Sequence, residues 1–248
     1  MARSLFFRLR YGIGHHIGKL SPKSYKRLKE LKNTYLYGYK PSPIPFSIIF
    51  MNPCDITKKM QTHKYNAKYM DHGLDGEVKS GNWDDKTIEL SEYWKCKDMY
   101  RVFDKNEQWE NTRHYENMRE SGMSHNDTIS HLKQYDILFE NFNQYGYKYG
   151  KETGGMIGDE ILVNISRDGT FIFGSSGTHR LCLAQISKLD RVPVRVMVRH
   201  KKWQTIREKI YELNNSNQPI PDHLSKYTTH PDIRHVIEAN SEQMTELV

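Results

Sequence analysis

The spacing of hydrophobic residues changes near residue 160. Beyond that point Ile161, Val163 and Ile165 recur at every second position, as do Phe171 and Phe173, on either side of Arg167-Asp168-Gly169. Alternation with period two around a Gly-containing turn predicts a β-hairpin. An apolar helix over 181–189 and a strand over 192–198 follow. The order from residue 160 onward is therefore strand, turn, strand, helix, strand.

Before residue 160 the spacing mostly favours helices. Ser21-Pro22 is a typical helix start, and Tyr25, Leu28, Leu31 and Tyr35 supply an apolar stripe until prolines end the helix. Further patterns predict an amphipathic helix over 4–19, a short strand over 47–50, a polar helix after Asp55, a loop over 71–90, and helices over 105–120 and 128–144.

These patterns predict an α+β protein with a small mixed sheet and extensive helical additions at both ends. We expect a basic helical arm (1–45), a mostly helical region that packs on the core (46–150), the core itself (151–202) and a C-terminal helical extension (203–248).

The positive charge is concentrated at the N-terminus. Residues 1–40 hold ten Lys or Arg against one acid, a net +9, whereas the whole chain is +7. This segment is a solvated arm, a contact for nucleic acid, or a docking element for an anionic membrane. Three widely spaced cysteines without a Cys-x-x-Cys pair predict neither disulfides nor a zinc site. We expect a cytoplasmic protein that can lie against a membrane periphery.

The residues with the clearest chemistry are Ser175, Ser176, Gly177, Thr178, His179 and Arg180, between a strand and a helix. A small-residue loop at a helix N-terminus presents unpaired N–H groups at the positive end of the helix dipole, which suits phosphate. Arg180 adds a guanidinium that can fork onto phosphate oxygens. A plain β-to-α turn with His179 packed in the core is the structural alternative.

The hairpin, loop and final strand together resemble the ParB/sulfiredoxin superfamily over residues 156–202. The matching residues are Arg167-Asp168-Gly169, Gly177-Thr178-His179-Arg180-Leu181, Ala184 and Val192-Pro193-Val194. Gly81-Asn82-Trp83-Asp84, Trp109…Thr112…Tyr115 and Tyr135-Asp136…Phe139 are similar to a subgroup of uncharacterised prokaryotic members.

The resemblance implies a ParB/sulfiredoxin-like core whose Gly-x-His-Arg turn binds nucleotide phosphates. Members include partition CTPases, sulfinic-acid reductases, a free-serine kinase and proposed nucleases. In sulfiredoxins the residue before His-Arg is the catalytic Cys, and here it is Thr178. Because a hydroxyl cannot replace a thiolate in sulfur chemistry, sulfinic reduction is not expected.

We therefore predict a kinase-like phosphotransferase that uses ATP or CTP with Mg²⁺ and a small hydroxylated acceptor. The loop would hold phosphates, Arg180 would neutralise transition-state charge, and His179 would orient a phosphate or act as acid/base. A nucleic-acid clamp or nuclease that uses residues 1–40, and a structural adaptor whose loop is only a helix cap, remain alternatives.

Phosphoryl transfer also needs a metal-binding acid. Asp84 and Glu160 are the preferred catalytic and Mg²⁺-binding candidates, and Asp136 and Asp159 are further ones. Asp168 is expected to serve only the hairpin turn. Arg199-His200 lies either beside the loop or at a solvated strand end. Trp83, Trp109 and Tyr115 are expected to anchor the core, with a cleft role open for Trp83.

Overall fold

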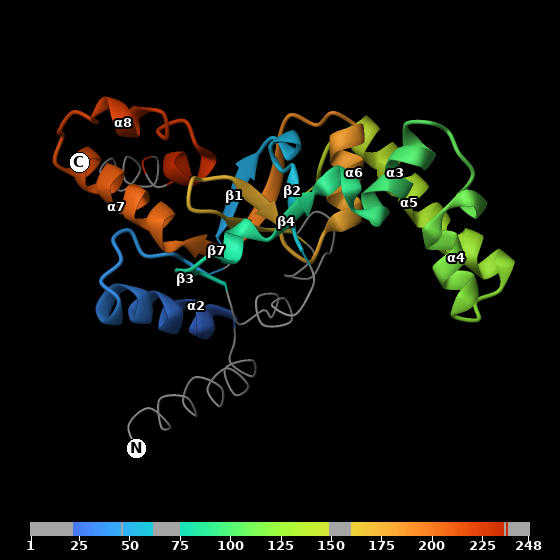
Figure 1. Ribbon diagram of the computed structural model, residues 1–248, viewed down its shortest axis with the longest axis horizontal. Coiled ribbons are helices and arrows are strands. Elements are labelled where there is room, and N and C mark those ends of the chain that lie inside the picture. Colours follow the sequence, from blue (N-terminus) through green and yellow to red (C-terminus); the bar gives the residue numbers. More distant parts are fainter. Residues whose placement is uncertain (1–21, 46, 62–74, 149–159, 236, 238–248) are drawn as a thin grey trace, which may run out of the picture.

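A computed structural model describes residues 22–45, 47–61, 75–148, 160–235 and 237. The amphipathic helix expected over 4–19 and the candidate acid Asp159 lie outside these residues. Within them the chain folds into a mixed sheet with helices on both sides (Figure 1). The α+β class with a mixed sheet is confirmed.

The sheet is built around two buried parallel strands, β5 (Ile161–Ile165) and β7 (Val192–His200). Every residue of both strands is buried, which explains their largely apolar sequences. The predicted hairpin is confirmed, because β5 pairs antiparallel with β6 (Phe171–Phe173). Residues before and after β5 therefore lie at opposite ends of the strands, well apart from each other.

Four short strands from the first 90 residues complete the sheet. They are β1 (Ile48–Met51), β2 (Lys58–Met60), β3 (Glu77–Lys79) and β4 (Thr87–Glu89). The strand order is β1-β7-β5-β6-β2-β4, and β3 pairs with β7. The region expected to be mostly helical therefore contributes strands to the same sheet as residues 160–200. The helix expected after Asp55 is wrong, because only a 3-10 turn and then β2 follow Asn52.

One group of helices packs together on one side of the sheet (Figure 1). It comprises α3 (Trp94–Phe103), α4 (Arg113–Glu120), α5 (His125–Tyr145) and α6 (Thr178–Ile186). α3 was not predicted, and α5 begins after an N-cap at Ser124, three residues before the expected helix over 128–144. Their buried side chains join those of β5, β6 and β7 in one hydrophobic core.

The remaining helices lie toward the other side of the molecule (Figure 1). They are α2 (Pro22–Leu31), α7 (Lys201–Asn215) and α8 (Asp222–Ser225). Short helical turns connect the elements: η1 (Lys32–Leu36, a π-helix), η2 (Pro53–Asp55), η4 (Trp83–Asp85), η5 (Leu90–Glu92) and η6 (Trp109–Asn111).

Two of the three cysteines form a disulfide, which corrects the expectation that none pairs. Cys96 on α3 is joined to Cys182 on α6, and both are fully buried. The third, Cys54, is free and exposed. The crosslink ties together the two helices that carry Asp98 and His179, two residues with central places in the site described next.

Candidate functional site

The loop between β6 and α6 is held against the start of β5 by backbone contacts. The Gly174 N–H donates to the Leu162 carbonyl at 2.8 Å, and the Leu162 N–H donates to the Ser176 carbonyl at 3.1 Å. Gly177 adopts φ +85°, and a Cβ there would lie 2.7 Å from the Ile161 Cα. Glycine tolerates both the positive φ and the close approach of Ile161, because it has no Cβ. The loop conformation is therefore set before any ligand binds.

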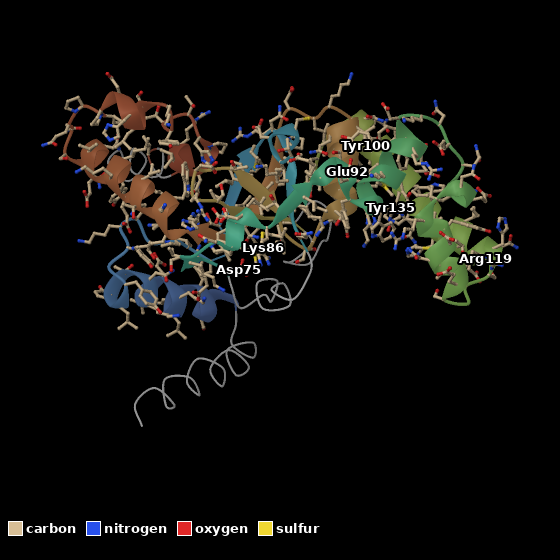
Figure 2. All side chains as sticks on the ribbon, viewed as in Figure 1. Asp75, Lys86, Glu92, Tyr100, Arg119 and Tyr135 are labelled. Atoms are coloured by element: carbon tan, nitrogen blue, oxygen red, sulfur yellow. A yellow bond between two sulfur atoms is a disulfide. The ribbon has the colours of Figure 1, made fainter. Side chains whose placement is uncertain are left out.

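A pocket of about 330 Å³ opens over this loop. It is lined by Lys95, Tyr135, Leu138 and all six residues from Ser175 to Arg180. Tyr135 projects from α5 beside α6 (Figure 2). The lining combines hydroxyls, two cations and a helix N-terminus with an apolar wall of Tyr135 and Leu138. This donor set suits an anion, such as a phosphate, that carries a flat or apolar group.

A chain of three titratable side chains leads from the pocket into the protein. The Nε2 atoms of His179 and His114 lie 2.9 Å apart, and the His114 Nδ1 lies 2.8 Å from the Asp98 Oδ2. The same carboxylate oxygen accepts the His114 backbone N–H at 2.9 Å. These residues come from α6, α4 and α3. We call them the Asp98–His114–His179 relay.

The protonation of the relay follows from its hydrogen bonds. Burial alone raises the pKa of Asp98, but the hydrogen bonds from His114 outweigh it and hold that pKa below its usual value. The ionised carboxylate can only accept, so the His114 Nδ1 carries a proton. When His114 is neutral, its Nε2 accepts a hydrogen bond from the His179 Nε2–H, which leaves the His179 Nδ1 as an acceptor.

His179 itself resists protonation. Burial lowers its pKa to about 3, with additional repulsion from His114, Lys95 and His131. Its ring is therefore neutral near pH 7. Within the described part of the chain no hydrogen bond reaches its Nδ1. This nitrogen is thus the relay atom that remains for a ligand in the pocket.

Aromatic rings enclose the relay and fix its orientation. The Tyr135 ring lies 4.3 Å from that of His179, and the Trp94 ring lies 4.8 Å from that of His114. Trp109 packs edge-on against His114 and donates from its Nε1 to Asp136 at 3.1 Å. Trp109 is therefore the core anchor expected from the sequence, and Asp136 supports it instead of facing the pocket.

The two acids proposed as alternative Mg²⁺ ligands lie at opposite ends of β5. Glu160 immediately precedes the strand, and its carboxylate binds Arg195 at 3.2 Å. Asp84 accepts the Arg167 backbone N–H at 2.9 Å beyond the other end. The five residues of β5 alone span roughly 16 Å. One cation cannot contact both carboxylates. Glu160 is the candidate next to the loop, since its backbone carbonyl would lie 3.0 Å from a Cβ on Gly177, whereas Asp84 lies at the far end of the strand.

Asp84 instead has a structural role. Its carboxylate binds the Arg167 guanidinium at 2.5 and 2.8 Å. Burial alone would raise the pKa of Asp84, but these hydrogen bonds dominate and lower it to about 2. Its neighbour Trp83 is buried among Met60, Leu162, Ile172, Met197 and Val198, which favours the core role over the cleft role. Asp168 accepts the Thr170 N–H at 3.1 Å and serves the turn, as predicted.

Arg199 and His200 also lie away from the loop. The parallel register places Arg199 beside Ile165, at the far end of β5 from Gly177. Arg199 is fully buried and forms a bidentate ion pair with Asp232 at 2.6 and 3.0 Å. His200 lies 2.9 Å from the Gly81 carbonyl through its Nε2. Both expectations for Arg199 and His200 are therefore wrong, because the two residues are buried and lie away from the loop.

Sequence reasoning missed Lys95, Asp98 and His114. No spacing links them to the loop, since His114 is separated from His179 by 65 positions and lies on a different helix. Within the described residues no three His, Cys, Asp or Glu side chains converge to hold a metal ion. No helix among them is long and apolar enough to cross a bilayer.

Comparison with known proteins adds no relative. No family model matches the chain, and neither the curated proteins nor the solved structures include a significant match. The chemistry of the site must therefore be argued from its own residues.

Proposed function

We propose that this protein is a nucleotide-binding phosphotransferase whose pocket lies over the loop from Ser175 to Arg180. ATP or CTP would be the phosphoryl donor, and a small hydroxylated molecule the acceptor. The observation that carries the proposal is the Asp98–His114–His179 relay, which reaches a pocket lined by phosphate-binding groups. The resemblance of residues 156–202 to the ParB/sulfiredoxin superfamily supports the same function.

The loop and its flanking cations would hold the phosphates. The N–H groups at the start of α6 face the position where an anion is most stable. Lys95 and Arg180 line the same pocket, and Arg180 is half-buried. Both cations would stabilise charge that builds on the transferred group and on the leaving diphosphate. Tyr135 and Leu138 offer an apolar surface for the nucleoside.

The relay would activate the acceptor hydroxyl. As its oxygen bonds to the terminal phosphorus, the bond from that phosphorus to the bridging oxygen breaks and the hydroxyl proton passes to the His179 Nδ1. The His179 Nε2 proton moves to His114, which becomes an imidazolium paired with the Asp98 carboxylate. The positive charge thus leaves the desolvated ring of His179 for a partner that stabilises it. Bound phosphates would also raise the low pKa of His179 toward the range of a useful base.

A nucleotide triphosphate normally carries Mg²⁺. The Asp84 carboxylate is held by Arg167 at the far end of β5, and the Glu160 carboxylate is bound by Arg195, so neither is placed as an Mg²⁺ ligand in the pocket. We therefore assign these two acids no metal-binding part in the reaction. The proposed chemistry rests on the side chains of the pocket and the relay alone.

The experiment is a pH–rate profile for release of inorganic phosphate from ATP and CTP, with water as the acceptor. We expect His114→Gln and Asp98→Asn to lower the rate by about 10²–10⁴-fold and to change the pH dependence. His223→Gln, at an exposed position on α8, is the matched control. Unchanged profiles in both relay variants, or no phosphate release by the wild type, would refute the proposal.

A further inference from the structure

Helix α2 and the following turn η1 expose an apolar surface. Leu28, Leu31, Tyr35, Leu36 and Tyr37 are 49, 43, 79, 74 and 51 % exposed. We call these five residues the α2–η1 outer face. Exposed apolar residues are common singly, but a group of five along one helical segment indicates an interaction surface.

The same helix is attached to the protein by polar groups. Lys29 forms an ion pair with Glu77 on β3, and Lys32 lies 3.7 Å from the same carboxylate. Asn33 is buried, and its Nδ2 donates to the carbonyls of Pro43 and Gly76, both at 2.9 Å. The amphipathic pattern is thus inverted, because the polar side faces the protein and the apolar side faces away.

The inversion is clear from the helical spacing. Within α2 successive residues turn by about 100°, so Leu28 and Leu31 share one side and Lys29 points away from it. In η1, Tyr35 is exposed whereas Asn33 is buried. Burying Lys29 has a cost, since burial lowers its pKa despite the attraction of Glu77. A helix whose only partner were β3 would place its leucines there instead. The outer face therefore needs an occupant of its own.

The charge around this face selects the occupant. Arg27 is exposed one turn before Leu31, and Lys32, one turn after Leu28, has a side chain that is 37 % exposed. Glu30 is the only acid among residues 1–40. A surface that combines leucines, tyrosines and flanking cations matches an anionic bilayer, where apolar side chains enter the headgroup boundary and cations meet lipid phosphates. Nucleic acid would match the cations but leave the leucines without a function.

We propose that the α2–η1 outer face docks side-on against an anionic membrane surface. Leu28, Leu31 and Tyr35 would enter the interface, and Arg27, one turn before Leu31, would contact acidic headgroups. Figure 1 shows α2 at the edge of the molecule, well separated from α5 and α6. Docking would therefore leave the pocket open, and the inference does not depend on the proposed function.

The test is co-sedimentation of the full chain with phosphatidylcholine vesicles, with and without phosphatidylserine. We expect binding to the phosphatidylserine vesicles that weakens as salt rises. The triple variant Leu28→Gln, Leu31→Gln, Tyr35→Gln should bind about tenfold less tightly or worse. It should still fold, because the replaced side chains are exposed and glutamine favours helix.

The matched control replaces Ile137 and Tyr145 by Gln, since both are exposed on α5. This variant should bind vesicles like the wild type. Equal binding by wild type and triple variant, or no binding to either vesicle, would overturn the proposal. So would a dimer that the triple variant abolishes, or salt-sensitive binding to duplex DNA without vesicle binding. Those two results would assign the surface to a second copy or to nucleic acid.

Discussion

Replacing His179 by Gln should flatten the dependence of stability on pH. In the folded protein the pKa of His179 is about 3, well below its usual 6.5, because burial and the neighbouring His114 disfavour the charged ring. Between these two values the unfolded chain binds a proton that the native state does not. The free energy of unfolding therefore falls as pH falls through this window.

The size of the effect follows from the shift. Below pH 6.5 the loss is about 1.4 kcal/mol per pH unit, which gives about 2 kcal/mol by pH 5 and about 5 kcal/mol by pH 3. In His179→Gln this contribution is absent. His230, whose pKa burial also lowers, titrates in both proteins, so the difference between them isolates His179.

The assay is urea unfolding at pH 7 and at pH 5. Wild type should lose about 2 kcal/mol more than His179→Gln over this interval. The His223→Gln variant controls for replacement of a surface histidine. Equal losses in wild type and His179→Gln would mean that the His179 ring is protonated freely. The relay would then lack the neutral, desolvated base on which the proposed chemistry depends.

Two further predictions concern the scaffold of the site and of the sheet. Gly177→Ala should destabilise the protein by about 2 kcal/mol or more, because φ is +85° and the new Cβ meets the Ile161 Cα. Gly122→Ala, at φ +92° with open space around it, should cost less, and equal costs in thermal unfolding would contradict the predicted clash. Asp232→Asn should cost about 3–5 kcal/mol in urea unfolding, because Arg199 and Arg207 would stay buried without their counter-charge. A cost below about 1 kcal/mol would show that the pair is unimportant.

The part of the fold that could be predicted is the part with strong local patterns. The strands β5 and β6 and the helix α6 are rich in apolar residues because they are buried, and Arg167-Asp168-Gly169 marks the turn between the strands, so the hairpin and the helix could be predicted. The strands β3 and β4 have three residues each, too few for a period to show. Helix α3 begins with Trp94 and mixes charged with apolar residues, so its buried side is not evident without its partners.

The candidate site divides in the same way. The loop with its Gly177 turn could be predicted because its residues are adjacent in the chain. The relay could not, because α3, α4 and α6 bring Asp98, His114 and His179 together only through tertiary packing. The pairing of Asp84 with Arg167 and of Glu160 with Arg195 likewise depends on the register of the sheet. Spacing alone therefore predicted the loop as a candidate anion site, but it could not show that Asp84 lies at the far end of β5 from the loop.

The most direct measurement is isothermal titration of the full chain with ATP and CTP. The account predicts saturable binding to wild type and a loss of about tenfold or more in Arg180→Ala, because a charged contact to phosphate is removed. Arg119→Ala, on α4 at the far edge of the molecule (Figure 2), should bind like the wild type. Absence of binding to either nucleotide, or equal affinity in Arg180→Ala and wild type, would contradict the claim that this loop is a phosphate site.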